Sequence, residues 1–293
     1  MKERIALIGA GRVGRSLAAA LAYAGLEVAL VIDRRAAAAE AAASVCGAAA
    51  GSDPAALKQI KYSLLILAVP DDAIAAAAAE LAAAGVVAPG TMVVHCSGSL
   101  PAALLEPLRP HTRRLASMHP LQSFAGREEE WRRWSGIHIA LEGEEGTLAS
   151  LEQIVLRMQS RPFRLPAEAK TFYHIACVLL SNGLVGLYAA ADELLEEVAL
   201  PAEEKRAMTE PLVRNTIANV IASGPAAALT GPVSRGDIGT VSNHLRALAA
   251  EQPGLLELYR TLSLRLLKLA EQEGRLTRLQ KEALTNLLDY QYE

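Results

Sequence analysis

Three glycines near the amino terminus have the spacing of a phosphate-binding turn. Gly9, Gly11 and Gly14 form G-x-G-x-x-G directly after an apolar run and at the start of a helix-like run. In such a turn the first glycine permits a tight bend, the second lets the backbone approach a pyrophosphate, and the third lets the helix pack on the strand. The free amides and the dipole of the helix start favour an anion. The pattern therefore predicts a dinucleotide site.

The predicted contacts to the dinucleotide lie in two loops that follow apolar runs. Such loops meet at the ligand-binding edge when the runs are parallel strands. We expect the cofactor to contact Gly9, Ala10, Gly11, Arg12, Val13, Gly14, Val69 and Pro70.

The residues after the second apolar run bear on the choice between two dinucleotides. Asp33 lies about twenty residues after the glycines, where a carboxylate accepts hydrogen bonds from ribose hydroxyls and repels a 2′-phosphate, which favours NAD. Arg34 and Arg35 follow at once, and guanidinium groups there can pair with that phosphate, which favours NADP. These residues alone leave both cofactors open.

A long helix predicted from about residue 167 carries groups suited to hydride transfer. Reduction of a carbonyl or imine needs a proton donor and groups that orient the substrate. At about 100° per residue, Lys170, His174 and Ser181 share one face of this helix. We predict His174 as the general acid, with Lys170, Ser181 and Asn182 orienting the substrate, although Asn182 lies about 120° round the helix from Lys170. The alternative is structural: a solvated Lys170 and a core histidine at 174.

Three further polar residues lie in predicted loops. His119 and Ser97 follow apolar runs, where a parallel sheet presents its ligand crevice, so His119 is a second candidate acid and Ser97 a candidate substrate contact. Arg235 lies in the glycine- and proline-punctuated stretch ALTGPVSRGDIGTV and could hold a substrate carboxylate. The alternative for that stretch is an interhelical loop in which Asp237 caps the next helix.

Two kinds of region must position these residues. The first half alternates short apolar runs with alanine-rich helical runs, which is typical of a parallel sheet covered by helices on both faces. Strands are expected at 4–8, 27–32, 64–69, 92–95, 115–118, 137–141 and 162–165, with helices starting near 12, 36, 71, 100 and 147. The strand signal stops at Pro166. We therefore predict a dinucleotide-binding α/β domain over 1–166 and an all-helical substrate and dimerisation domain over 167–293.

Composition narrows the classes of protein. Lys and Arg number 29 against 32 Asp and Glu, so the net charge of −3 gives no basic footprint for nucleic acid. The three cysteines form no C-x-x-C pair and the six histidines no H-x-x-H or H-E-x-x-H pattern, so no metal site is expected. No secretory pattern opens the chain, which favours a cytoplasmic protein.

The longest apolar segment, 171–195, bears on the question of a membrane. It carries His174, Ser181, Asn182, Asp192 and Glu193, which hydrocarbon would not tolerate. We therefore expect no membrane span and interpret the segment as a buried helix of a soluble protein.

Three further stretches carry a family resemblance: SMHPLQSFAG at 117–126, YHIACVLLSNGLVGLYAAADELL at 173–195 and ALTGPVSRGDIGTVSNHLRAL at 228–248. In this order they resemble bacterial Rossmann-like proteins with a DUF2520 domain, described as predicted NADP-dependent oxidoreductases. The wider group contains 6-phosphogluconate dehydrogenase, pyrroline-5-carboxylate reductase and ketopantoate reductase. The resemblance implies a Rossmann-type, doubly wound, mostly parallel sheet followed by an all-helical domain.

The resemblance also implies site residues. The wider group binds NADP through an arginine just after the second strand, so Arg34 and Arg35 lead us to expect NADP despite Asp33, with NAD as the alternative. A lysine and a downstream asparagine on the long helix commonly carry catalysis there, and the pair Lys170 and Asn182 matches only loosely. SMHPLQ is similar to the histidine-proline loop that borders the active site of prephenate dehydrogenases.

These observations favour an NAD(P)-dependent oxidoreductase that acts on a small carboxylate-bearing keto, hydroxy or imino compound, ketopantoate being one candidate. The helical half is too elongated to cover its own apolar faces, so we expect a homodimer. The alternative function is a nucleotide-binding regulatory or scaffold protein without turnover. A weaker one is a nonredox enzyme that uses the nucleotide structurally.

Overall fold

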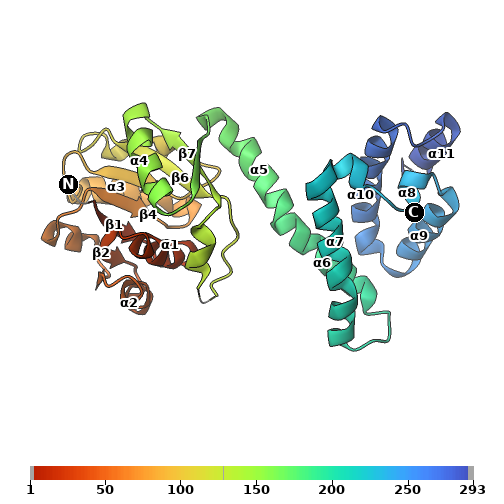
Figure 1. The fold of residues 1–293 in the computed structure, drawn as a ribbon, viewed down its shortest axis with the longest axis horizontal. Helices are drawn as coiled ribbons and strands as arrows, with labels where there is room; N and C mark the ends of the chain where they lie inside the picture. Colours follow the sequence, from red (N-terminus) through yellow and green to blue (C-terminus); the bar gives the residue numbers. More distant parts are fainter. Residues whose placement is uncertain (1–2, 128, 290–293) are drawn as a thin grey trace. The chain divides into compact units, whose positions relative to one another are not determined.

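The computed structural model describes residues 3–127 and 129–289. The chain divides into two compact units, Met1–Gly183 and Leu184–Glu293 (Figure 1). Residues within each unit contact one another more than they contact the other unit. The predicted boundary at 166 instead separates parts that could each fold alone. That boundary therefore stays a prediction.

An eight-stranded sheet in the order β3-β2-β1-β4-β5-β6-β7-β8 forms the first unit. Neighbouring strands are parallel except for β6 and β7, which are antiparallel. The strands are β1 (Arg4–Ile8), β2 (Glu27–Ile32), β3 (Ala49–Gly51), β4 (Leu64–Leu67), β5 (Met92–His95), β6 (Leu115–Pro120), β7 (His138–Gly143) and β8 (Arg161–Arg164). The doubly wound, mostly parallel sheet expected from the sequence is confirmed.

Helices connect the strands. The α-helices of this unit are α1 (Arg12–Tyr23), α2 (Ala36–Ser44), α3 (Ile74–Ala84), α4 (Glu145–Arg157) and α5 (Lys170–Leu180). The 3-10 helices are η1 (Pro54–Gln59), η2 (Asp71–Ala73), η3 (Ala102–Leu108), η4 (Glu130–Trp134) and η5 (Ala167–Ala169). Helices begin close to each predicted start, whereas the sequence missed η1, η4 and the short strand β3, whose residues Ala-Ala-Gly have no β-branched side chain.

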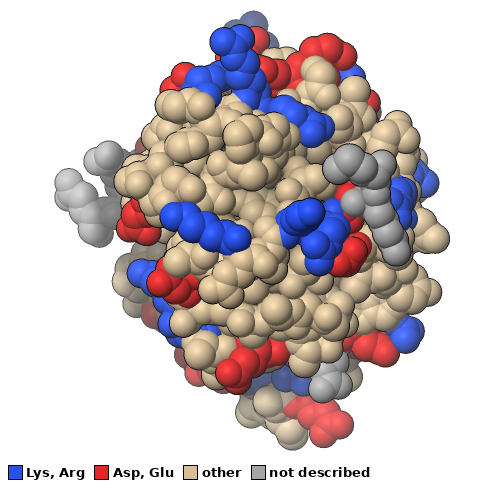
Figure 2. All heavy atoms as spheres, turned by 90° about the vertical axis from the view of Figure 1, so that its left-hand side faces the viewer, with Lys and Arg blue, Asp and Glu red and all other residues tan. Residues whose placement is uncertain are grey.

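Charged side chains of both signs are dispersed over the surface. On the face shown in Figure 2, Lys and Arg lie among Asp, Glu and uncharged residues. This arrangement agrees with a net charge close to zero.

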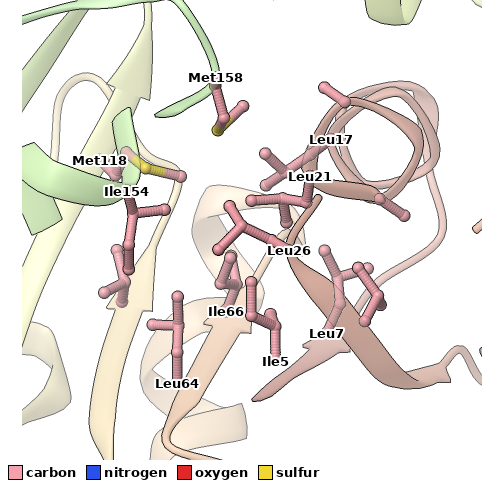
Figure 3. Packing of buried hydrophobic residues seen from close by; sticks show 14 of the residues in the cluster. Ile5, Leu7, Leu17, Leu21, Leu26, Leu64, Ile66, Met118, Ile154 and Met158 are labelled. Atoms are coloured by element: carbon pink, nitrogen blue, oxygen red, sulfur yellow. The ribbon is translucent and has the colours of Figure 1, made fainter. Parts of the chain in front are cut away.

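Alternate side chains of each central strand pack on opposite faces of the sheet. Ile5 and Leu7 of β1 belong to a buried cluster with residues of α1, α2 and α4, whereas Ala6 belongs to a second cluster with residues of α3 and η3. Figure 3 shows Leu17 and Leu21 of α1 directed toward the strand side chains of the first cluster. Helices on both faces thus hold the sheet, and with it the loops at its edge.

The second unit is all-helical, as expected. Its helices are α6 (Asn182–Leu195), α7 (Ala202–Ala228), α8 (Pro232–Arg235), α9 (Ile238–Glu251), α10 (Pro253–Gln272) and α11 (Arg278–Asp289), of which α6 begins just before the division. A small core of Val233, Val241, Leu245, Leu267, Leu284 and Leu288 joins α8 to α11. Gly224, at φ +80°, interrupts α7.

The expectation of a buried long helix was wrong. In α5 only Lys170 is buried and in α6 no residue is, while Phe172 and Leu180 are 79% and 81% exposed. By length and hydropathy alone, Ala167–Leu195 could cross a membrane, and it is the one such helix among residues 3–127 and 129–289. An apolar stripe predicts that a helix face is covered, but it does not say that the same chain covers it.

Candidate functional site

The glycine-rich turn joins β1 to α1 and leaves space for an anion. Gly9 has φ +100°, and a Cβ atom there would collide with the carbonyl oxygen of Ala68. A Cβ at Gly14 would collide with the carbonyl oxygen of Gly9. Around Gly11, by contrast, no atom lies within 4 Å of a Cβ position. The turn therefore fits a dinucleotide pyrophosphate, which would lie over Gly11 and the start of α1.

The other predicted cofactor residues border this turn. Val69 follows β4, and its amide nitrogen lies 3.1 Å from the Cβ position of Gly9. Pro70 comes next, immediately before η2. The structure thus brings the two predicted cofactor loops together at the edge where β1 and β4 end.

Asp33 is turned toward the glycine-rich turn. Its Oδ2 accepts a hydrogen bond from the amide of Ala10 at 2.7 Å, and its Oδ1 accepts one from the amide of Arg35 at 2.9 Å. Burial alone would raise the pKa of Asp33, but these hydrogen bonds outweigh it and lower the pKa. The guanidinium Nε of Arg35 lies 3.4 Å from Oδ1, and its side chain is 74% exposed. Arg34 is exposed as well. The carboxylate thus shapes the turn, and both arginine side chains reach solvent.

Lys170 is buried at a second site on the same sheet. It is 1% exposed, and its Nζ donates to Oγ of Ser117 at 2.7 Å and to the carbonyl oxygen of Ser97 at 3.2 Å. The Ser117 hydroxyl in turn donates to Oε2 of Glu142 at 3.1 Å. Burial lowers the pKa of Lys170, and the carboxylates of Glu142 and Asp71 oppose that shift. The alternative of a solvated lysine is therefore wrong.

Sequence reasoning missed Ser117 and Glu142. They are opposite one another in the antiparallel pair of β6 and β7. A signal was present, because each is a polar residue next to apolar residues of a buried strand. The order and direction of strands in the sheet decide which residues are opposite one another, however, and the sequence did not reveal that β6 and β7 are antiparallel neighbours.

The loop after β5 is held by its own polar groups. The Ser97 hydroxyl donates to Oδ2 of Asp71 at 2.8 Å and accepts from the amide of Leu100 at 3.0 Å. His95 is fully buried, accepts from the amide of Ser97 at Nδ1 and donates from Nε2 to the carbonyl oxygen of Pro101. Burial lowers the pKa of His95 to about 4, so its imidazole is neutral at pH 7. Ser97 thus lies at the site, and its hydroxyl is already hydrogen-bonded to Asp71 and to the amide of Leu100.

Two histidines meet next to this loop. The ring centroids of His119 and His174 are 5.7 Å apart at 80°, and Nδ1 of His119 lies 2.9 Å from the hydroxyl of Tyr173. A Cβ atom at Gly98 would lie 2.7 Å from both Nε2 of His119 and Nδ1 of His174. Burial, with the nearby His174 and Lys170, lowers the pKa of His119 to about 4.

One imidazole nitrogen in this pair lacks a partner. Nδ1 of His174 is buried and has no hydrogen-bond partner among the described residues. A core histidine held only for packing would have its buried nitrogen satisfied. The unpaired nitrogen therefore favours the functional interpretation of His174 over the structural one.

Two other predicted residues lie away from this cluster along the helix. The Ser181 hydroxyl is 2.8 Å from the carbonyl oxygen of Cys177 and 3.0 Å from Oδ1 of Asn182. At 1.5 Å per residue, Asn182 lies about 18 Å beyond Lys170. The structure therefore brings together Lys170, His174, His119 and Ser97, but not Asn182.

Arg235 is the last residue of α8 in the second unit, and its side chain is exposed. Asp237 caps α9 through the amide of Thr240 at 3.0 Å, as the sequence predicted. Arg275 donates to the carbonyl oxygen of Leu229 and to Oγ of Ser234. These contacts account for the shape of the loop, and the role of Arg235 in substrate binding stays a prediction. Residues 3–127 and 129–289 contain no cluster of three side chains suited to a metal ion.

Comparison with known proteins agrees with this geometry. A Rossmann-like domain matches residues 1–120, and a domain of unknown function, DUF2520, matches residues 137–266. The chain is a Rossmann-like protein with a DUF2520 domain. The predicted family resemblance is confirmed. Among curated proteins, none is similar enough to this chain to be matched.

Solved structures extend the comparison. A Bacteroides fragilis protein that carries the provisional name NADP oxidoreductase is 29% identical, with TM-score 0.75, over 91% of this chain and 98% of its own. A Thermotoga maritima protein is 26% identical, with TM-score 0.70, over 92% and 99%. Prephenate dehydrogenase from A. aeolicus, in complex with hydroxyphenyl propionate and NAD+, shares the fold at 13% identity and TM-score 0.51, over 94% and 87%. The chain thus shares its fold over most of its length with these three proteins.

The open space at Gly11 predicts a separation of binding from folding. In Gly11→Val the new methyl groups would occupy the pyrophosphate position, so the dissociation constant for NADPH should rise at least about tenfold while the melting temperature is retained. Gly14→Ala is the matched control, because its Cβ collides with backbone and should lower the melting temperature instead. NADPH titration calorimetry and thermal melts measure both effects. Wild-type affinity in a folded Gly11→Val protein would refute this placement of the pyrophosphate.

The depressed histidine pKa values predict loss of stability in acid. His95 and His119 titrate near pH 4 when folded and near 6.5 when unfolded, so the unfolded chain binds protons first as the pH falls. The free energy of unfolding should therefore fall between about pH 6.5 and 4, by about 1.4 kcal/mol per unit of pKa difference, and should not depend on these groups above pH 7. Urea denaturation at several pH values measures this. His95→Gln keeps a donor and an acceptor without titrating, so it should flatten the decline; an unchanged slope would contradict the assignment.

Proposed function

We propose that the chain is an NADP-dependent oxidoreductase that acts on a small carboxylate-bearing keto, hydroxy or imino substrate, for which ketopantoate is one candidate. The observation that carries the proposal is the placement of two unlike sites on one sheet. The open space at Gly11 lies at the end of β1, and the cluster of Lys170, His119 and His174 lies beside the ends of β5 and β6. A dinucleotide in such a sheet extends across that edge, from its pyrophosphate toward its nicotinamide.

The chain's own residues account for substrate orientation and proton transfer. The nicotinamide, when bound, supplies or accepts the hydride. His174 is proposed as the general acid, because its unpaired Nδ1 faces the same space as Nε2 of His119. His119, held by Tyr173 and neutral at pH 7, would donate a hydrogen bond to the developing oxyanion, and it is the second candidate acid.

The remaining predicted residues have supporting roles in this proposal. Lys170 fixes the loop of Ser97 next to the substrate and keeps a positive charge near the reacting carbonyl or imine. Ser181 and Asn182 would contact distal substrate atoms, and Arg235 would hold the carboxylate. For NADP, Arg34 and Arg35 would bind the 2′-phosphate, which the inward turn of Asp33 leaves room for.

Loss of NADPH absorbance during incubation with a panel of 2-keto and 2-imino acids tests the proposal. With an active substrate, His174→Ala should lower kcat by about 100- to 10,000-fold and leave the dissociation constant of NADPH nearly unchanged, because a general acid acts only on the chemical step. His111 precedes β6, at the end of that strand opposite to His119, so His111→Ala is the matched control and should retain the rate.

The same assay separates the alternatives. A His174→Ala enzyme that turns over at the parent rate moves the general acid to His119, which His119→Ala then tests. Tight NADPH binding with no turnover on any substrate of the panel would favour the regulatory or scaffold function. Failure of the wild-type chain to bind any nicotinamide dinucleotide would overturn the proposal.

We further propose a cytoplasmic homodimer that covers the exposed apolar helices. Leu180 of α5, Val185 of α6 and Ile221 of α7 are large, apolar and mostly exposed. A second copy of the chain would bring an identical apolar helix to each such face, which suits a symmetric interface.

Light scattering at micromolar concentration should give twice the mass of the chain, and Leu180→Asp should shift the protein toward monomer because a carboxylate would be buried in the interface. Leu156→Asp is the matched control: Leu156 is an exposed leucine of α4, and its replacement should leave the mass unchanged. A wild-type monomer in solution, or wild-type protein found only in the membrane fraction, would contradict the proposal.

A further inference from the structure

A cavity of about 1050 Å³ lies beside the glycine-rich turn. Its walls come from α1, from α2 with the residues that flank it, and from the connection between β6 and β7. Four guanidinium groups line it, from Arg12, Arg15, Arg35 and Arg127. Arg127 belongs to none of the elements that conventionally bind a dinucleotide, because it follows the sixth strand of the chain rather than the first or second.

The two acids of the cavity wall that the structure describes, Glu129 and Glu130, are engaged by other groups. Glu130 is buried, and its carboxylate accepts hydrogen bonds from the amides of Ala125 and Gly126, both at 2.7 Å. Glu129 forms an ion pair with Arg132 at 2.9 Å instead. Within residues 3–127 and 129–289, Arg12, Arg15 and Arg127 form no ion pair. Arg35 pairs only with Asp33, whose carboxylate also accepts hydrogen bonds from two backbone amides.

Such a cavity fits a phosphate dianion. Like charges confined to one cavity repel, so an anion with several acceptor oxygens stabilises all of them, and a guanidinium pairs with phosphate through two parallel hydrogen bonds. The pyrophosphate position at Gly11 and the place of Arg35 after β2 set where the adenosine ribose lies. Gly11 and Arg35 both line the cavity, so the pyrophosphate and the 2′-phosphate of NADP would both lie along it, and of the two only the 2′-phosphate is missing from NADH.

The connection between β6 and β7 is held against the turn by specific contacts. A Cβ atom at Gly126, at φ +85°, would lie 3.4 Å from Cγ of Arg12, so the backbone here packs on the aliphatic part of that side chain. The two amides bound by Glu130 are those of the residues just before Arg127. Residues 125 and 126 are therefore held beside the cofactor turn.

On the basis of the proposed function, we infer that Arg127 is a specificity-determining residue that contacts the 2′-phosphate of NADP together with Arg12 and Arg35. The cofactor preference of this chain then depends on a loop outside the βαβ unit that binds the pyrophosphate. Asp33, although an acid at the position typical of NAD sites, does not oppose this preference because its oxygens are held by backbone amides.

Dissociation constants for NADPH, NADH, 2′,5′-ADP and 5′-ADP test the inference. A charge-assisted hydrogen bond contributes about 1.5–3 kcal/mol, so Arg127→Ala should weaken NADPH and 2′,5′-ADP by about 10- to 100-fold and leave NADH and 5′-ADP within about twofold. Arg35→Ala should show the same pattern. Arg161→Ala is the matched control, because Arg161 is an exposed arginine of β8 and is not part of the cavity wall. It should change none of the four constants.

The outcomes distinguish this inference from the proposed function. Wild-type preference for NADPH with no selective loss in Arg127→Ala overturns the role of Arg127 and leaves the oxidoreductase standing. If Arg127→Ala selectively loses affinity for 2′,5′-ADP but the wild-type chain turns over no substrate, the role of Arg127 is supported and the proposed enzymatic function is not. Equal affinity of the wild-type chain for NADPH and NADH overturns the inference. Arg127 is exposed, so the variant is expected to melt as the parent does, which a thermal melt checks.

Discussion

A buried ammonium group organises the proposed catalytic half of the sheet. Removing the charge of Lys170 from water is costly unless polar partners replace the solvent. Those partners come from the loop after β5 and from β6, with the carboxylate of Glu142 behind them on β7. Because Lys170 is the first residue of α5, satisfying its charge fixes where that helix starts. Tyr173 and His174, three and four residues later, are thereby directed toward His119.

The cofactor half depends on packing instead of buried charge. The turn is shaped by contacts that exclude a Cβ atom at two glycines and by a carboxylate that binds its backbone. In the sheet, β4 and β5 separate β1 from β6, so the two halves lie three strand spacings apart, or about 14 Å. A rigid, doubly covered sheet maintains that separation, which a two-part ligand requires.

The parts of this arrangement that were predictable are local. Strands rich in Val, Ile and Leu, the glycine spacing, the cap at Asp237 and the cluster of Lys170, His174 and His119 follow from short-range patterns and from the rule that parallel strands present their ends at one edge. The pairing of Ser117 with Glu142 could not be predicted, because it depends on an antiparallel register between strands. The inward turn of Asp33 is a choice of rotamer. The exposure of α5 and α6 depends on what covers them, and a helical stripe carries no information about that.

The reversal of direction between β6 and β7 affects how such a protein can diversify. A connection between parallel strands must return along the whole height of the sheet, whereas an antiparallel connection begins and ends at one edge. Residues 121–127 and 129–137 begin at the ligand-binding edge and pack along α1, with Gly126 against Arg12 and Trp131 against Tyr23. Related chains could exchange one ligand for another by changing exposed residues of this segment, such as Arg127, while the buried Phe124 and Trp134 keep its packing against the first helix.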